Sequence, residues 1–376
     1  MISRRSFLFG AAGTVLAAGA GGALFATTRT PHAALAPWQA PGALATDPRV
    51  KAAEWAILSP NPHNRQPWLL ALSGANEVTV FCDLDRRLPV TDPFDRQIMI
   101  GLGCFIELYR LAAAQEGFEA IITPFPEGAP ALNERLDKRP VAHIALVDGA
   151  APDPLFAAAP NRRSYKEPFT DQAVAGSVLA GVRTASGVAF QDTVEADRVA
   201  ALRTLCWDAW LIESENPAAH QESVDLMRIG KDEIEQNPDG IDLGGPMLEA
   251  LHVAGLLTRE TVADPTSTAY AQGKAAYEEM IGSAKGFVWQ VAENTRAAQL
   301  QAGRDWLRIN LAATAAGLAV HPLSQCLQEY EAMAPAYAQA HAALAPEGGT
   351  VQMLARVGYG PDVPPTPRWP AATRIL

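Results

Sequence analysis

The stretch SPNPHNRQPW, from Ser59 to Trp68, decides how the chain can fold, because it is rich in proline and polar residues yet lies between two segments expected to be ordered. Proline fixes φ and restricts the residue before it, so this stretch is neither helix nor regular strand until Trp68. The preceding segment PRVKAAEWAILS is expected to be a short helix, and the following WLLALSG a strand. The sequence therefore predicts a stiff polar loop of defined shape.

The rest of the chain alternates between expected strands and helices. EVTVFCDL forms a hairpin with WLLALSG, and PVAHIALVDG is a further strand. Apolar residues recur at helical spacing from Asp95 to Ala120, with a stop signal at Gly117. A mostly helical region from Leu211 to Gly286 is interrupted by a loop, NPDGIDLGGP. The segment GFVWQVAENTRAAQLQAGRDWLRINLAATAAGLAVHPLSQ is expected to form a long helix, and VQMLARVGYGPDVPPTPRWP a buried strand followed by a proline-rich arm.

The composition is that of an ordinary soluble protein. The 376-residue chain is 48% hydrophobic and can bury a large core. Acidic residues outnumber basic ones by 41 to 30, so nucleic acid is not an expected partner. The seven histidines form no HExxH pattern and the cysteines no CxxC pair, so we expect no metal site and free buried thiols at Cys82, Cys104, Cys206 and Cys326.

The N-terminus has the layout of a twin-arginine export signal. SRRSFLFG places two arginines before a mildly apolar stretch, Leu8 to Ala26, and ALA at Ala34 to Ala36 is a candidate cleavage site. We therefore expect residues 1–36 to be a signal read by the twin-arginine export machinery, and the protein to be periplasmic or in the cell envelope. The alternative is an uncleaved membrane anchor, since the apolar stretch is nearly long enough to span a bilayer.

A basic segment opens the second part of the chain. In NRRSYKEPF the residues Arg162, Ser164 and Lys166 alternate, so an extended chain projects them to one side. Two cations and a hydroxyl on one face suit a phosphate group. A solvated basic strand end explains the same pattern equally well.

Four segments together resemble the FMN-dependent nitroreductase superfamily: RRSYK at 162–166, PHNRQPW at 62–68, AATAAGLAVHPLSQ at 312–325 and PTPRWP at 365–370. The paired arginines at the N-terminus and the total length resemble its Acg-like branch, and the resemblance covers about residues 47–370. It implies an α+β fold of mixed, mainly antiparallel sheets flanked by helices. It also implies FMN as cofactor and two-electron, hydride-type transfer through flavin N5, with a small-molecule electron donor or acceptor as partner.

The same resemblance implies which residues hold the flavin, while no catalytic side chain is assigned. The basic segment and the late arginine would bind the phosphate and the pyrimidine edge, the polar loop would form the far wall, and the segment HPLSQ would face the ring, with a backbone N–H at N5. These residues are Arg162, Ser164, Lys166, Arg368, Asn61, Pro62, His63, Asn64, Pro322, Leu323 and, as the N–H donor, Ser324. For His63 a structural role is preferred to a catalytic one, and Arg65 is expected to form a salt bridge.

The motifs are divided between two parts of the chain. Residues 37–150 hold NxQPW without RxSxK, and residues 151–376 hold RxSxK, PLSQ and PRWP without NxQPW. Because most nitroreductases are homodimers, the resemblance implies two fused halves, a monomeric pseudo-dimer with one composite FMN site. The extra region at about 211–286 is then a helical lid. The alternatives are a non-catalytic FMN-binding or flavin-storage protein whose lid covers the isoalloxazine, and a flavin-cleaving or dehalogenating enzyme with the same site.

Overall fold

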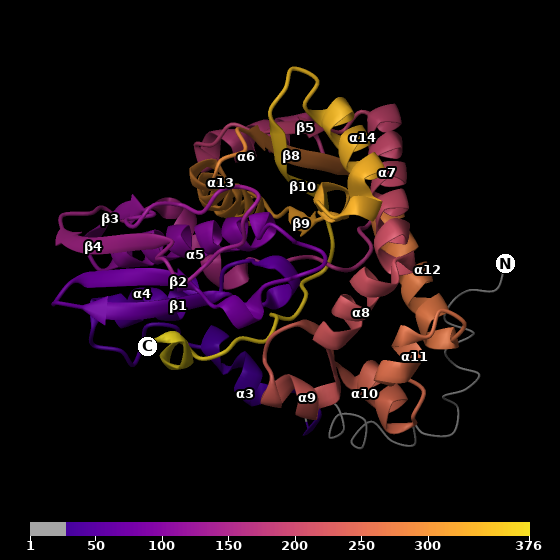
Figure 1. Cartoon of the computed structure of the whole chain (residues 1–376), viewed down its shortest axis with the longest axis horizontal. Coiled ribbons are helices and arrows are strands. Elements are labelled where there is room, and N and C mark those ends of the chain that lie inside the picture. The colour runs from indigo at the N-terminus through magenta and orange to yellow at the C-terminus, as the bar shows by residue number, and fades with distance from the viewer. Residues whose placement is uncertain (1–27) are drawn as a thin grey trace.

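The structure is a computed structural model that describes residues 28–376 (Figure 1). Most of the predicted export signal, including its paired arginines and apolar stretch, falls on residues 1–27 and lies outside the described residues. Its last part is described and contains a short helix, α3 (His32–Leu35), followed by the 3-10 turn η1 (Ala36–Trp38).

The first half, residues 37–150, is an antiparallel sheet with two helices. Its strands have the order β1-β2-β4-β3. Asp47 caps the first helix by accepting the Arg49 N–H. The elements are α4 (Pro48–Ala56), η2 (Pro62–Asn64), β1 (Trp68–Ser73), β2 (Glu77–Cys82), η3 (Leu84–Arg86), α5 (Arg96–Gln115), β3 (Phe118–Pro124) and β4 (Ala142–Asp148). The expected helix is thus confirmed from Arg96 to Gln115, and the predicted stop at Gly117 is confirmed as well, because Gly117 has a φ of 85° and the strand β3 begins at the next residue.

The second half repeats this layout around a second antiparallel sheet, of order β5-β8-β10-β9. The expected long helix begins only at Arg296, because Thr295 caps it, and the preceding GFVWQVA is the central strand β8. The elements are η4 (Pro154–Asn161), α6 (Gly176–Ser186), β5 (Gln191–Thr193), α7 (Ala196–Glu215), β8 (Gly286–Ala292), α13 (Arg296–Ala315), β9 (Ala319–Pro322), η5 (Gln325–Leu327), η6 (Glu331–Met333), α14 (Ala334–Leu344), β10 (Thr350–Gly358) and η7 (Ala371–Arg374).

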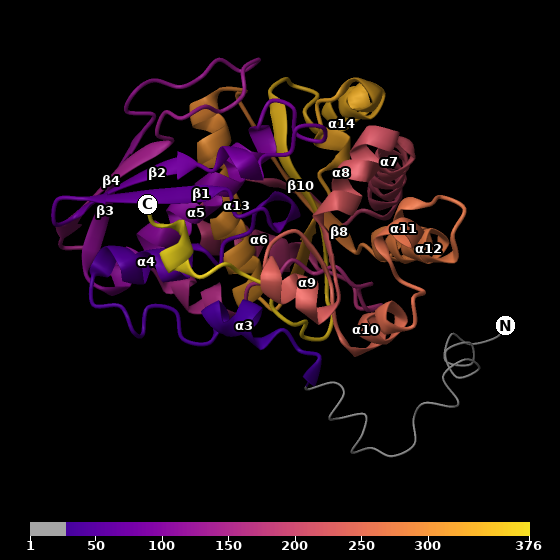
Figure 2. The ribbon, with the colours of Figure 1, turned by 60° about the horizontal axis from the view of Figure 1, so that its bottom comes forward.

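Between α7 and β8 the chain makes the helical excursion that the sequence predicts, hereafter the insertion. It lies at one side of both halves (Figures 1 and 2). The expected loop NPDGIDLGGP is not wholly irregular, because its middle forms β7, which pairs in parallel with β6. The elements are α8 (Pro217–Leu226), β6 (Met227–Ile229), α9 (Gly230–Gln236), β7 (Ile241–Leu243), α10 (Pro246–Val253), α11 (Arg259–Ala263) and α12 (Thr268–Gly282).

The two long helices α5 and α13 lie between the sheets and pack on each other (Figure 1). They cross at a pair of glycines. A Cβ at Gly103 would lie 2.1 Å from the Leu300 carbonyl oxygen, and one at Gly303 would lie 2.0 Å from that of Ile100. Only glycine allows this approach, which also lets the Cys104 thiol donate to the Gly303 carbonyl at 3.1 Å.

The first residue of each long helix reaches into the opposite half. The Arg96 guanidinium donates to the Gln352 carbonyl at 3.0 Å and to that of Leu327. The Arg296 guanidinium donates to the Phe94 carbonyl at 2.8 Å and to that of Glu134. The two halves therefore contact each other through reciprocal pairs, and both their sheets have the same strand order.

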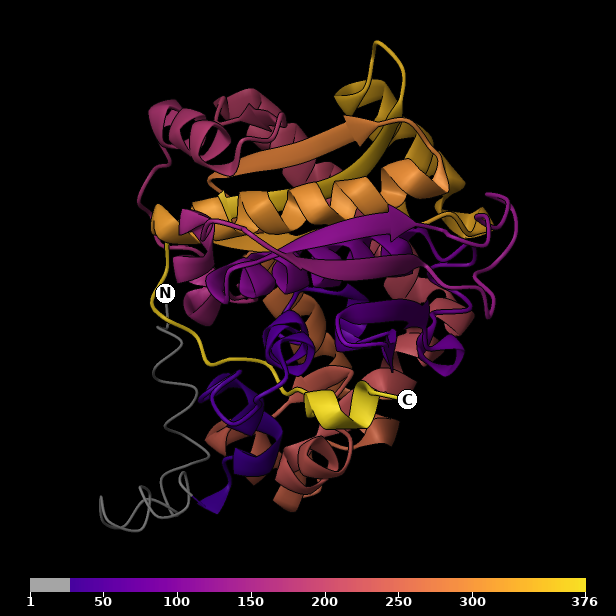
Figure 3. The same ribbon diagram turned by 90° about the vertical axis from the view of Figure 1, so that its left-hand side faces the viewer.

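Helix α5 is the one helix among residues 28–376 that is long and apolar enough to cross a membrane, and nearly all of it is buried inside the protein. The four cysteines are free and buried, as expected. After β10 the proline-rich arm runs from the second half across to the first, where Ile375 bridges to Leu70 of β1 (Figure 3).

Candidate functional site

The polar loop after α4 holds a strained backbone. Three non-glycine residues have left-handed φ values, His63 at 46°, Asn64 at 51° and Gln66 at 52°. Such conformations cost roughly 1–3 kcal/mol each and persist where surrounding contacts impose them. One of these contacts is internal, since the Gln66 N–H donates to the Asn61 side-chain oxygen at 2.7 Å, and Pro62 packs on Gly101 of α5. The prediction that this stretch forms neither helix nor regular strand before Trp68 is confirmed, because only the 3-10 turn η2 occurs in it before β1 begins.

Arg368 of the arm clamps this loop. It is 2% exposed. Its Nε donates to the Ile57 carbonyl at 2.7 Å, its Nη2 to the Ser59 carbonyl at 3.2 Å, and its Nη1 to the Asn64 side-chain oxygen. The Asn64 amide in turn donates to the Pro367 carbonyl at 3.0 Å. Both predicted site residues, Asn64 and Arg368, are thus engaged with each other and with backbone carbonyls.

Arg162 lies against the same loop and keeps an unused donor. It is 3% exposed, and its Nη2 donates at 3.1 Å to the Leu58 carbonyl, which also accepts from Arg368. Its buried Nη1 has no partner within residues 28–376. Burial, with the neighbouring Arg163 cation as second cause, lowers the pKa of Arg162 to about 10. Burial, followed by repulsion from Arg162, lowers the pKa of Arg368 to about 9.

We call Arg162, Arg163 and Arg368 the arginine cluster. In the part of the chain that the structure describes, none of the three forms an ion pair with a carboxylate. Arg162 and Arg368 are buried and Arg163 is half-buried, and burying a cation without a paired carboxylate is costly. Backbone carbonyls and the more distant Asp242 carboxylate offset part of this cost. The cluster is therefore a candidate site for an anion.

The basic segment runs beside β9, which brings two further predicted pieces together. The Tyr165 N–H donates to the Val320 carbonyl at 2.9 Å. Arg356 of β10 binds both the basic segment and β9, because its Nη2 donates to the Tyr165 carbonyl at 2.8 Å and its Nε donates to His321 Nδ1 at 3.2 Å. Ser164 is half-buried and Lys166 exposed. Burial, then the Arg356 guanidinium and then the Lys166 ammonium lower the pKa of His321 well below its usual value.

His63 of the loop also lies near Lys166. Burial lowers the pKa of His63 to about 4, and the Lys166 ammonium contributes, so the imidazole is neutral near pH 7. No hydrogen bond to its ring is present among residues 28–376. The loop, the basic segment and the end of β9 thus converge on one region.

At the end of β9, backbone groups rather than side chains are available for contacts with a ligand. Pro322 pairs with Ala355 in the sheet, and Leu323 is 2% exposed within the core of the second half. Within the described residues the Ser324 N–H has no hydrogen-bond acceptor. The Ser324 hydroxyl donates to the Gln97 side-chain oxygen at 3.2 Å, and the buried Gln97 amide nitrogen has no partner of its own in residues 28–376.

The insertion closes over the loop from the other side. The buried Asp239 carboxylate pairs with Arg65 at 3.1 Å, Arg86 at 2.6 Å and Arg228 at 2.9 Å. The Gly240 N–H donates to the Asn64 carbonyl at 3.2 Å, and Lys166 lies 3.7 Å from Asp242. The expected salt bridge of Arg65 is confirmed, and the segment 238–242 lies on both the loop and the basic segment.

A buried acid beneath the insertion was not singled out from the sequence. Burial raises the pKa of Glu213 to about 7, and its carboxylate accepts from the Gln328 amide at 2.7 Å. Arg356, Asp239 and Gln97 were missed as well. Buried polar residues within apolar runs, such as Arg356 in VQMLARVG, are the signal that could have found them.

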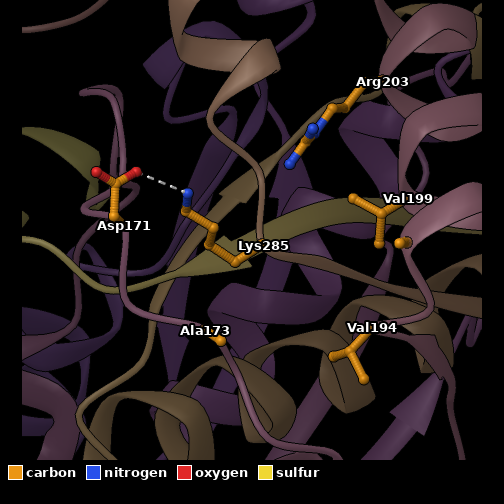
Figure 4. A pocket seen from close by; sticks show the side chains of 7 residues that line it. Asp171, Ala173, Val194, Val199, Arg203 and Lys285 are labelled. Carbon is orange, nitrogen blue, oxygen red and sulfur yellow. Dashed lines mark hydrogen bonds and ion pairs between the residues drawn. The ribbon is translucent and has the colours of Figure 1, made fainter.

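Two cavities lie away from these residues. One, of about 230 Å³, is lined by Lys285, Asp171 and Arg203, with Lys285 Nζ 3.3 Å from Asp171 (Figure 4). The other, of about 400 Å³, lies among α8, α11 and α12 beside His220 and Tyr270. Neither is lined by a predicted site residue. No group of three metal-binding side chains occurs within residues 28–376.

Comparison with known proteins agrees with the family that the sequence motifs resemble. No model of a protein family matches the chain. It is 26% identical over 326 residues to "Putative NAD(P)H nitroreductase Rv3131" of Mycobacterium tuberculosis, covering 83% of this chain and 86% of that protein. It is 26% identical over 325 residues to "Uncharacterized protein Rv3127" of the same organism, covering 84% and 89%. A further match, 35% over 81 residues, is to "Putative NAD(P)H nitroreductase acg", covering 22% and 24%. These similarities support the nitroreductase family, and with it an oxidoreductase of the nitroreductase type.

Proposed function

We propose that the chain is an FMN-binding oxidoreductase of the nitroreductase type that works after twin-arginine export, in the periplasm or cell envelope. The observation that carries the proposal is the arginine cluster, whose buried charge has no carboxylate partner and which lies where the polar loop, the basic segment and the arm meet. The names of the relatives support the class of reaction.

The residues of the site fit FMN. A flavin phosphate supplies the negative charge that the cluster lacks, and the unpartnered Nη1 of Arg162 is a donor for it. Arg368 contributes charge and rigidity rather than new hydrogen bonds, because its N–H groups are already used by the loop. Bound FMN supplies a two-electron carrier at N5.

Other residues would position and tune the ring. Lys166 is exposed and only loosely paired, so it can turn its charge to a flavin edge, with Ser164 beside it. The Ser324 N–H is available as the donor to N5. In the loop, Asn61 and Pro62 fix the backbone. His63 is neutral and lies near Lys166 of the basic segment, and the Asn64 carbonyl accepts from the Gly240 N–H of the insertion. Pro322 and Leu323 would place the Ser324 N–H through their backbone.

The two halves are proposed to form a single-chain pseudo-dimer with one site. The identical strand orders and the reciprocal contacts of Arg96 and Arg296 support this. In a two-fold interface each contact occurs twice, once from each half to the other. The expected protein is a monomer that binds one FMN. Two flavins per purified chain, or a dimer in solution, would contradict the pseudo-dimer.

The alternative is a flavin-binding or storage protein without turnover, favoured by the insertion. Its segment 238–242 is fixed on the loop through Asp239 and Gly240, as expected of a lid over the isoalloxazine.

Flavin absorbance of the purified chain, with NAD(P)H or a chemical reductant and then a nitroaromatic added, tests the two readings. Bleaching and turnover support the enzyme. A bound flavin that stays oxidised supports storage, and a chain that neither retains nor binds FMN contradicts both.

A further inference from the structure

The first described residues, Thr28 to Gln39, cross between the insertion and the arm. On the insertion side, Lys231 Nζ of α9 donates to the Thr28 carbonyl at 3.0 Å, and the Ala33 N–H donates to the Glu235 carboxylate at 3.4 Å. A third contact is an ion pair of Arg29 with Glu249 of α10 at 3.5 Å. Helix α3 lies beside α9 in both views (Figures 1 and 2).

On the arm side the same residues make two backbone contacts. The Arg368 N–H donates to the Ala34 carbonyl at 2.9 Å, and the Trp38 indole N–H donates to the Thr366 carbonyl at 2.8 Å. Ala34 is 2% exposed. The segment is therefore seated on the arm rather than lying loosely over it.

The Trp38 ring covers two members of the arginine cluster. The guanidinium carbon of Arg163 lies 4.5 Å from the ring centre, and that of Arg368 lies 5.5 Å from it. Stacking of an aromatic face on a cation is worth more when both are shielded from water. Trp38 thus covers part of the arginine cluster, which is the anion-binding end of the proposed site.

We propose that residues Thr28–Gln39 form a strap that closes the anion-binding end of the site and retains a phosphate-bearing ligand there. The inference rests on the proposed function for the identity of that ligand, FMN. The strap is bonded to both the insertion and the arm, so in this proposal the ligand leaves only after the strap detaches. A cut at Ala34 to Ala36 would remove the three contacts to the insertion described above, so retention requires that these residues stay on the chain after export.

The test is the rate at which FMN leaves the full-length holo-protein, followed by flavin fluorescence after dilution. Trp38→Ala and a chain lacking residues 2–36 are expected to release FMN about ten-fold faster or more, because each loses a cation–π contact or several hydrogen bonds. Trp38→Phe keeps an aromatic face but loses the indole N–H, so its release rate is expected to fall between those of the unaltered chain and Trp38→Ala. Leu44→Ala is the matched control, since Leu44 is 94% exposed and outside the strap, and its release rate should be unchanged.

The outcomes separate the strap from the proposed function. Bound FMN with equal release rates in all variants overturns the strap and leaves the proposed function standing. Failure of the unaltered chain to bind FMN overturns both. Trypsin cleavage at Arg29, in protein without FMN, provides a second measurement for variants that bind flavin poorly. Cleavage faster in Trp38→Ala than in the unaltered chain supports the docked strap, and equal rates overturn it.

Discussion

The Asp239 carboxylate is the centre of the contact between the insertion and the polar loop, and we expect Asp239→Asn to loosen it strongly. The carboxylate is 6% exposed and has guanidinium nitrogens at 2.6, 2.9 and 3.1 Å from Arg86, Arg228 and Arg65. Asparagine keeps the shape and one acceptor oxygen but removes the charge. Breaking a buried ion pair by neutralising one partner costs about 3–5 kcal/mol, because the opposite charges stay buried and unpaired. Since the arginines also donate to carbonyls and Arg86 keeps a second ion pair, with Asp83 at 3.1 Å, the lower end, about 3 kcal/mol, is expected.

Denaturant unfolding followed by tryptophan fluorescence measures this loss, and partial proteolysis shows where the chain has opened. Glu116→Gln is the matched control, because Glu116 also pairs with a cation at 2.7 Å, Lys51, but both side chains are partly exposed. A surface pair of this kind is worth about 0–1 kcal/mol. The insertion should become the first site of proteolysis in Asp239→Asn alone. If both variants lose the same small stability and digest alike, Asp239 does not hold the insertion on the loop.

Three further variants test the site and the core. In a flavin titration, Arg162→Ala should weaken FMN binding by about ten-fold or more, because a buried charged donor is lost, and Arg162→Lys should weaken it less. Equal FMN affinities of the two variants and the unaltered chain would contradict the anion site. Burial raises the pKa of Glu213 from 4.5 to about 7, so the folded state holds this proton more tightly and the contribution of Glu213 to stability falls as pH rises through that window. Glu213→Gln should flatten this fall between about pH 4.5 and about pH 7 in denaturation curves, and an unaltered slope would count against the assignment. Gly303→Ala should lower the free energy of unfolding by about 1–3 kcal/mol or more, because its Cβ would lie 2.0 Å from the Ile100 carbonyl oxygen. The control Gly181→Ala, at an exposed position of α6, should raise it by about 0.5–1 kcal/mol in the same denaturation curves. A tolerated Gly303→Ala would contradict the close crossing.

Local sequence signals were sufficient for much of the fold. The hairpin of β1 and β2 and the helix α5 were predicted because their apolar residues recur with periods of two and 3.6. Strand β8 was misread as helix for a physical reason. It lies in the middle of its sheet with Gly286 to Gln290 all buried, so its apolar run does not alternate and resembles the helix that follows.

The candidate site was predicted in its segments but not in its contacts. The four motifs do converge, yet the amide of Asn64 binds Pro367 and Arg368, which lie about 300 positions away in the sequence. Asp239 pairs with Arg65 across 174 positions. Such pairings depend on how the two halves and the insertion pack, and neither residue type nor spacing within a motif records that.

The contact between the two halves is visible in the sequence as a repeat of two residues, and this repeat bears on why a single site is proposed. Arg96 and Gly103 of α5 recur 200 positions later as Arg296 and Gly303 of α13, in the same reciprocal contacts between the halves. The sheets match in the same order, so α4 corresponds to α6 and β1 to β5.

At the matching position of the second half, however, the chain has only residues 187–190 between α6 and β5, where the first half has the loop 57–67. That connection is too short to form a second far wall, and the segment before α4 contains no RxSxK pattern. The contacts that join the halves are thus duplicated while the residues that would hold a ligand are not. We infer that each half has specialised, one in supplying the wall and the other the charge, which is the physical basis for expecting one FMN per chain.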